Sequence, residues 1–296
     1  MRLNPDPALR NMPTTFAQSH PRWYALALIA LISLMPQPAL AHGLFDGHLV
    51  ERAPLILTAM ILASAWGLYI LGSRRIATRR SEAAWLHGAM LLAAFAVFGP
   101  IDDWAEHSTT WHMVQHMLFM VVIPPMWALA RPLPQWRAVT GRFAQPVWTA
   151  ILRVGRYPVP LAMLHGAMIW TWHTPKLYQL ALDNLWWHAV EHACFLFTAW
   201  LFWWSMLRAN PKQVPQALMA NLVTLMHTGL LGALLTFSST SFYGESRDVA
   251  DQQLAGLIMW VPGGLIYLIG AGWVAWRWLT RMWRRQQAGG SREELG

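Results

Sequence analysis

The sequence has little of several features that soluble or secreted domains depend on. Only 12% of the 296 residues are charged, and there is one cysteine, Cys194, which excludes an internal disulfide. No stretch alternates polar and apolar residues with the short period of a membrane β-barrel strand. The sequence also has no internal repeat, no low-complexity segment and no second, soluble domain. These absences leave a helical membrane protein as the class to consider.

What the chain has instead is apolar length. Hydrophobic residues make up 55% of it, and the mean hydropathy is +0.30. Apolar runs of about 20 residues, enough for a helix to cross a bilayer, recur along the chain. Most of the 20 tryptophans lie near the ends of these runs, where aromatic belts form. We therefore predict an all-α, polytopic integral membrane protein with seven transmembrane helices, at 53–72, 84–100, 111–130, 158–173, 186–207, 216–237 and 254–276.

The first 41 residues have the pattern of a secretory signal peptide. A polar, basic segment is followed by an apolar core from Trp23 to Met35 and by the small-residue sequence Ala39-Leu40-Ala41. About 13 apolar residues are short for a span, which favours cleavage after Ala41 over an uncleaved anchor. The predicted organisation is a signal peptide at 1–41, a seven-helix membrane domain at 42–285 and a cytoplasmic tail at 286–296.

The basic residues are distributed unevenly between the connections. They gather at 74–80, 131–156, 208–212 and 277–292, and few lie in the intervening connections. By the positive-inside rule, this predicts a bacterial inner-membrane protein with a periplasmic mature N-terminus and a cytoplasmic C-terminus. The net charge of +8 therefore reflects topology and does not indicate nucleic-acid binding. Within the long connection 131–157, arginines mixed with apolar residues predict an interfacial amphipathic helix.

Two histidine pairs stand out, because ionisable groups inside a bilayer are costly and need a partner or a function. His112 and His116 open the third predicted span, and His188 and His192 open the fifth, with Glu191 between them. A separation of four residues puts both imidazoles of a pair on one helix face, roughly 6 Å apart along the axis. Equal spacing and equal depth predict that the pairs share one metal or haem site near the outer face.

Further candidate ligands lie at the same face. His173 ends the fourth span, His107 precedes the third, and His42 would begin the mature chain and offer its α-amine and imidazole as a chelating pair. Met113 and Met117 supply thioethers beside the first pair. Imidazole combined with thioether suits Cu(I), whereas zinc would use more carboxylate or thiolate.

Other residues with metal-binding chemistry are interpreted differently. His87, His165 and His227 lie deeper and are interpreted as hydrogen-bonding groups between helices. Cys194 is about 200° around the helix from His192 and is not counted as a ligand. The spacing His-x-x-Glu-His at 188–192 matches an inverted zinc-protease motif, but no substrate cleft accompanies it. We therefore expect no enzymatic activity.

Three separated stretches also carry a resemblance to a known family. They are WHMVQHMLFMVVIPP at 111–125 with Arg131-Pro132, WHTPKLYQLALDNLWWHAVEHACFLFTAWLFWW at 172–204, and LMHTGLLGALLTFSSTSFY at 225–243 followed by DQQLAGLIMWVPGG at 251–264. In this order, over about residues 80–280, they resemble the CtaG family of bacterial cytochrome c oxidase assembly factors of the caa3 type. The family's motif positions correspond to His112, His116, His173, His188, His192, His227, Asp251, Gln252 and Met259.

The resemblance implies a role in making an active haem–copper oxidase, by handling copper for that enzyme. Copper is then the expected cofactor, and the expected partners are the lipid bilayer, cytochrome c oxidase subunits and a periplasmic copper carrier. Two alternatives stay open. A haem-binding membrane redox protein would use the histidine pairs as axial ligands. A copper transporter would continue the outer cluster inward through His165, His227 and His87.

Overall fold

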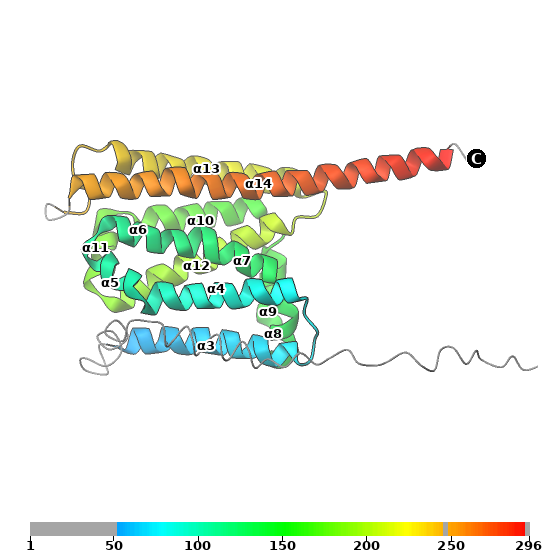
Figure 1. Ribbon diagram of the computed structural model, residues 1–296, viewed down its shortest axis with the longest axis horizontal. Helices are drawn as coiled ribbons and strands as arrows, with labels where there is room; N and C mark the ends of the chain where they lie inside the picture. The colour runs from blue at the N-terminus through cyan, green and yellow to red at the C-terminus, as the bar shows by residue number, and fades with distance from the viewer. Residues whose placement is uncertain (1–51, 245–247, 294–296) are drawn as a thin grey trace, which may run out of the picture.

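The computed structural model describes residues 52–244 and 248–293, and this part of the chain is all-α (Figure 1). The predicted signal peptide, its cleavage site and His42 lie outside the described residues. The long helices are α3 (Ala53–Ser73), α4 (Arg80–Phe98), α10 (Pro158–Trp172), α12 (Leu185–Leu207), α13 (Val214–Phe237), α14 (Val249–Glu293), and a composite helix of α6 (Thr109–Met117), η2 (Leu118–Val122) and α7 (Ile123–Ala130).

Several of these helices have the character of membrane spans. Among the described residues, five segments are long and apolar enough to cross a bilayer, namely α3, α4, Thr109–Ala130, α13 and Val249–Gln287. α10 and α12 occupy the predicted fourth and fifth spans. However, α10 has only 15 residues, and α12 opens with histidines and a glutamate, which lower its hydropathy. The chain is thus a helical membrane protein, and the count of seven spans stays a prediction.

The third predicted span is not a uniform α-helix, because two prolines interrupt its hydrogen bonding. Pro124 has no N–H to donate to the carbonyl of Met120, four residues earlier. The span contains a π-helical turn at Leu118–Val122, just before the prolines. Trp203 of α12 donates its indole N–H to the Met120 carbonyl at 2.9 Å. A side chain from a neighbouring helix therefore satisfies the carbonyl that the proline leaves without a partner, as a membrane interior requires.

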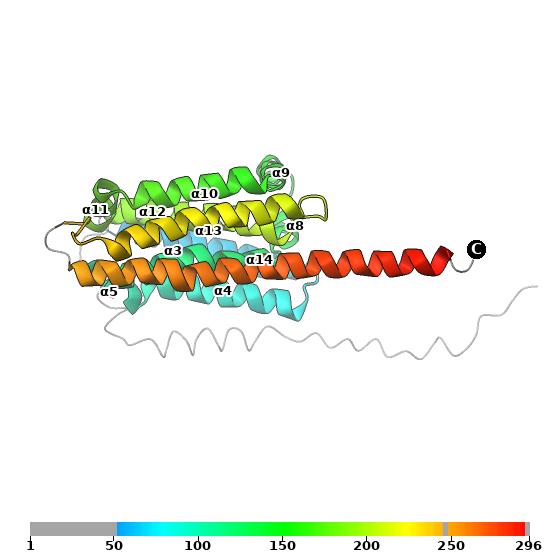
Figure 2. The same cartoon turned by 90° about the horizontal axis from the view of Figure 1, so that it is seen from above.

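Helices α13 and α14 lie side by side along the bundle, and α14 extends beyond its end (Figure 2). Their close approach depends on two glycines. A Cβ added at Gly256 would lie 2.6 Å from the Gly232 carbonyl oxygen and 2.6 Å from Thr236 Oγ1. Small residues at such a crossing let two backbones touch, which is how helices associate in lipid.

The connection 131–157 forms two short helices instead of the single amphipathic helix that the sequence predicts. They are α8 (Leu133–Thr140) and α9 (Gln145–Val154). Gly141, with φ of 56°, follows the last residue of α8, and Pro146 lies in the first turn of α9. Trp136 is buried and donates to the Ala65 carbonyl of α3 at 2.9 Å, so α8 packs on the bundle. α9 has no buried residue, and Phe143 just before it is almost fully exposed, as expected for an interfacial segment.

Two further short helices lie at the end of the bundle where α6 and α12 begin. They are α5 (Pro100–His107) and α11 (Pro175–Asp183), and both start with proline in the first turn, where a missing N–H costs nothing. Figure 1 shows both at the end opposite α8 and α9. This end carries the histidine pairs.

Candidate metal centre

The helix that carries His112 and His116 is fixed at its first residues by another helix. Ser108 is the N-cap of α6, and its hydroxyl donates to Asp251 Oδ1 at 2.9 Å. The Asp251 carboxylate also accepts the backbone N–H groups of Thr109 and Thr110. Because Asp251 belongs to α14, it joins the start of α14 to the start of α6. A carboxylate at a helix N-terminus is also favoured by the helix dipole.

Helix α12 positions the second pair by a cap of its own. The side-chain oxygen of Asn184 accepts the backbone N–H groups of Trp186 and Trp187, at 2.9 and 3.4 Å. The first turns of α12 then direct Glu191 and His192 into the bundle, where both are buried. His188 is partly buried one turn earlier. The two caps set the pairs at the same depth.

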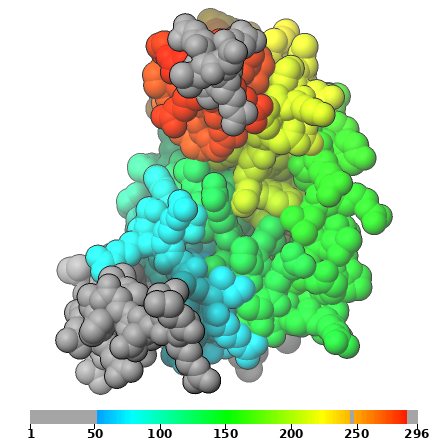
Figure 3. Space-filling model, turned by 90° about the vertical axis from the view of Figure 1, so that its right-hand side faces the viewer, coloured from blue at the N-terminus to red at the C-terminus, as the bar shows by residue number. Residues whose placement is uncertain are grey.

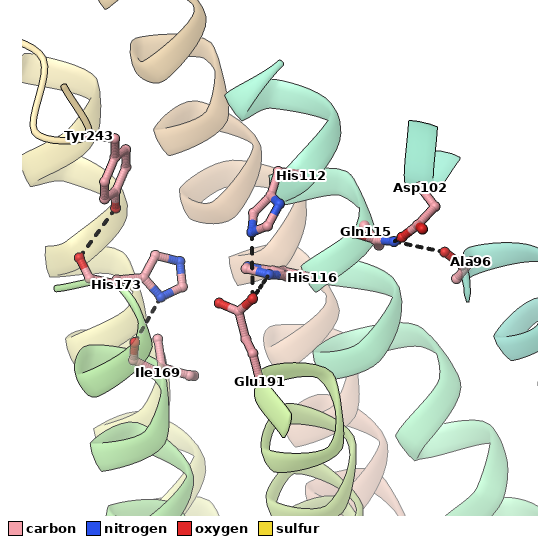
Figure 4. Close-up of polar contacts among 9 residues, drawn as sticks. All are labelled: Ala96, Asp102, His112, Gln115, His116, Ile169, His173, Glu191 and Tyr243. Atoms are coloured by element: carbon pink, nitrogen blue, oxygen red, sulfur yellow. Dashed lines mark hydrogen bonds and ion pairs between the residues drawn. The ribbon is translucent and has the colours of Figure 1, made fainter. Parts of the chain in front are cut away.

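The two pairs lie close together, and the Glu191 carboxylate faces His112 and His116 (Figure 4). Glu191 Oε2 is 3.5 Å from His116 Nε2 and 3.8 Å from His112 Nε2. The ring centroids of His112 and His188 are 5.6 Å apart with the rings stacked, and those of His116 and His192 are 5.9 Å apart. The structure therefore brings both pairs to one place, as the sequence predicts.

Glu191 completes two overlapping groups of potential ligand atoms. One consists of His112, His116 and Glu191, and the other of His188, Glu191 and His192. In each group the ligand atoms lie within 4.8 Å of one another. The sequence interpretation noted Glu191 only for its place in the His-x-x-Glu-His spacing. Its position facing α6 depends on how two helices pack and could not be read from that spacing.

His173 adds a fifth imidazole with a defined tautomer. It follows the last residue of α10, and its ring centroid lies 5.7 Å from that of His116. Its Nδ1 is 2.8 Å from the Ile169 carbonyl oxygen, which can only accept a hydrogen bond. The proton is therefore on Nδ1, and Nε2 keeps a lone pair. A backbone carbonyl that holds the second nitrogen in this way is typical of metal-binding histidines.

The cluster contains an unusual number of buried polar atoms that lack hydrogen bonds. Within the described residues, no hydrogen-bond partner exists for His116 Nδ1 and Nε2, His173 Nε2, His188 Nε2, His192 Nε2, or Glu191 Oε1 and Oε2. Leaving a buried polar atom without a hydrogen bond costs about 1–3 kcal/mol. Such groups are few in folded proteins, and each calls for an explanation. A bound cation would supply a partner for several of these atoms at once.

Two tyrosines cover the cluster, and the sequence interpretation did not select either. Tyr178 of α11 lies edge-on to His112, with ring centroids 5.0 Å apart. Tyr243 stacks on Tyr178 at 3.7 Å and donates its hydroxyl to the His173 carbonyl at 3.4 Å. Gln252 holds the loop before Tyr243 by accepting the Phe242 N–H at 2.7 Å. Both tyrosines lie within the stretches that carry the family resemblance, and this position is the one sequence feature that could have indicated them.

The remaining predicted ligands lie elsewhere. His107 is exposed at the end of α5, with Nδ1 3.1 Å from the Asp103 carbonyl oxygen of its own helix. Met113 is buried in the hydrophobic core. The sulfur of Met117 lies beside Gly263 of α14, where an added Cβ would come within 3.1 Å. The described structure thus brings five histidines together with Glu191. That His107, Met113 and Met117 bind the metal remains a prediction.

The deeper histidines largely follow their predicted role. His87 Nδ1 accepts the indole N–H of Trp66 at 2.8 Å, and His165 Nδ1 lies 2.9 Å from Thr198 Oγ1. Both are bonds between helices. His227 is different, since neither of its ring nitrogens has a hydrogen-bond partner among the described residues. It packs so closely on Gly166 that a Cβ there would come within 2.5 Å of Nε2.

The fold and the cluster define a class, a helical membrane protein with a buried group of imidazoles and one carboxylate near one end of its bundle. The family model described as cytochrome c oxidase caa3 assembly factor matches residues 65–281, well over half of the chain. The chain therefore belongs to the family of cytochrome c oxidase caa3 assembly factors. The whole cluster lies inside this match. No curated protein and no solved structure matches the chain.

Proposed function

We propose that this protein binds copper in the cluster of His112, His116, His173, His188, His192 and Glu191, and that it handles the ion for assembly of cytochrome c oxidase without being an enzyme. The family name supplies the oxidase. The observation that supports a metal is that the cluster atoms of His116, His173, His188, His192 and Glu191 lie together without hydrogen-bond partners among the described residues. Imidazole binds copper as well as zinc, iron and nickel, so the choice of copper rests on the oxidase role of the family and on the charge of the site.

Charge balance supports the reduced ion. Glu191 is the one carboxylate in the cluster, and it is fully buried. A single positive charge beside an ionised Glu191 leaves the site neutral, whereas a divalent ion leaves a net charge in a medium of low polarity. The site therefore favours Cu(I). We place it at the periplasmic face, because the arginine-rich connections lie at the opposite end of the chain's predicted spans.

The packing around the cluster favours an ion over a haem group. Phe195 lies edge-on to His116, with ring centroids 4.7 Å apart, and Phe119 lies 4.5 Å from His192. Both phenylalanines are buried. They fill the space beside the imidazoles that a porphyrin plane would need. A metal ion requires no such space.

The Glu191→Gln variant tests the site, because it keeps the side-chain volume and removes the charge. We expect it to lower the Cu(I) affinity of the purified protein at least about tenfold, which corresponds to ~1.4 kcal/mol. The measurement is competition with a Cu(I) chelator, with metal content checked by elemental analysis. Glu82→Gln, the same change at the opposite end of the bundle, is the matched control and should leave the affinity unchanged.

Equal copper binding by Glu191→Gln and wild type would place the copper site elsewhere. A wild-type protein that takes zinc but no Cu(I) would overturn the choice of metal. The oxidase role is tested separately in cells. Deletion of the gene should lower cytochrome c oxidase activity, and the Glu191→Gln variant should fail to restore it. Normal oxidase activity in the deletion strain would contradict the assembly role.

A further inference from the structure

A second concentration of charge lies at the end of the bundle opposite the histidines. There α4 begins, α7 and α12 end, and a later turn of α14 passes by. These segments bring Arg79, Arg131, Arg208 and Arg277 around a pocket of about 200 Å³, with Glu82 as its one acidic lining residue. Figure 3 looks onto this end of the molecule, where α4 (cyan) and α14 (red) face the viewer. The lining therefore holds four cations against one anion.

The backbone at Arg131 adds an independent observation. With φ of 53° and ψ of 50°, it is the one non-glycine residue at positive φ in the described part of the chain. This left-handed conformation is costly for a residue with a Cβ and natural for glycine. Pro132 follows and disfavours a right-handed helical conformation at Arg131, so the helix must end here. Glycine would suit this turn at least as well, so the reason for an arginine must lie in its side chain.

The pocket's own anion does not balance its cations. Arg131 Nη1 lies 3.7 Å from Glu82 Oε1, a long and partly exposed ion pair of a kind that contributes little to stability. Arg277 is held in place otherwise, with Nη1 donating to the Leu207 carbonyl at 3.3 Å and its guanidinium 4.3 Å above the Trp273 ring. Burial lowers the pKa of Arg208, and the nearby Arg131 lowers it further. The arginines thus face one another with a single acidic side chain among the residues that line the pocket.

We propose that this pocket binds a phosphate group, supplied by the headgroup of an anionic phospholipid. Arginine guanidinium groups match phosphate oxygens in geometry and charge. A volume of about 200 Å³ is smaller than the ~300–1,000 Å³ of pockets that enclose whole small molecules, so it suits a headgroup whose remainder lies outside. Trp85 and Trp273 line the pocket with large exposed faces, as tryptophans do at a membrane interface.

The test uses the full chain in neutral phosphatidylcholine nanodiscs. Phosphatidylglycerol is added in one arm and inorganic phosphate in the other, and both lipid retention by native mass spectrometry and the thermal unfolding midpoint are recorded. Wild type should retain phosphatidylglycerol and unfold at a higher temperature with it, and should not respond to inorganic phosphate at the same concentration. Arg131→Gly should weaken phosphatidylglycerol retention at least tenfold. Its unfolding midpoint in phosphatidylcholine alone should equal that of wild type or exceed it.

Two further variants make the result decisive. Arg284→Ala removes the same charge from the exposed end of α14, outside the pocket, and should retain the lipid like wild type. Arg131→Asn tolerates the left-handed backbone and should lose the lipid as Arg131→Gly does. Equal losses in the Arg131 and Arg284 variants would overturn the pocket in favour of general charge attraction. An equal response to inorganic phosphate would overturn the lipid as the source of the phosphate, and full retention by both Arg131 variants would overturn the site.

Discussion

Gln115 lies between His112 and His116 in sequence, but its side chain contacts α4 and α5 instead of the histidine cluster. Its Nε2 donates to the Ala96 carbonyl at 2.8 Å and to Asp102 Oδ1 at 2.7 Å (Figure 4). The amide therefore has its donors engaged, whereas neither ring nitrogen of His116 has a hydrogen-bond partner among the described residues. This contrast separates residues that hold the helix in place from residues that are available to a ligand.

The hydrogen bond from Gln115 has a consequence for pH dependence. Burial raises the pKa of Asp102 from the usual 3.8 to about 7, although the bond from Gln115 opposes the shift. The folded state therefore binds a proton that the unfolded state releases above about pH 4. Stability from this group is complete below pH 4 and is lost as the pH rises to about 7.

The Asp102→Asn variant tests this behaviour, because an amide oxygen can still accept the bond from Gln115 but does not ionise. The thermal unfolding midpoint of wild type should fall between pH 5 and pH 8 more steeply than that of Asp102→Asn. Asp183→Asn, the same change at an exposed aspartate of α11, should follow wild type. Parallel curves for wild type and Asp102→Asn would contradict the raised pKa.

At the scale of elements, the contact between α14 and the start of α6 determines where the first histidine pair lies. Asp251→Ala removes the acceptor of three donors on α6 and should destabilise the protein by about 0.5–2 kcal/mol. It should also weaken copper binding severalfold, since His112 lies one turn further on. Asp248→Ala is the control, because Asp248 accepts the Ala250 N–H of its own helix. Thermal unfolding and chelator competition measure both effects, and equal copper affinity in the two variants would show that Asp251 is not a positioning residue.

The crossing of α13 and α14 gives a second prediction at this scale. Gly256→Ala would push a methyl group against the Gly232 carbonyl and Thr236, a backbone contact that cannot move aside easily. We expect a loss of about 1–3 kcal/mol in stability, as for other overpacked sites. Gly272→Ala on the same helix meets nothing within 4 Å and should be nearly neutral. Unfolding midpoints of the two variants in one detergent decide the matter, and equal midpoints would rule out a tight crossing.

For the whole molecule, sequence reasoning reached the helical class, the family and the pairing of His112 and His116 with His188 and His192. These depend on apolar length, helical spacing and depth, which are properties of single segments. The place of Glu191, the cover formed by Tyr178 and the division of residues 131–157 into two helices depend on which segments touch. Gly141 could have indicated that division, because a glycine inside an amphipathic pattern often ends a helix.

The π-helical turn at Leu118–Val122 changes the direction in which the helix faces of the third span point before and after it. A π-turn contains one residue more than the α-turn it replaces, so the faces of α6 and α7 are offset by roughly 100° from those of a continuous helix. α6 packs against α14, while α7 packs against α4 and α12. The inserted residue lets each half turn its own packing face to different neighbours. A chain one residue shorter here would turn α6 and α7 by roughly 100° relative to each other, so the two halves could not both keep their present neighbours.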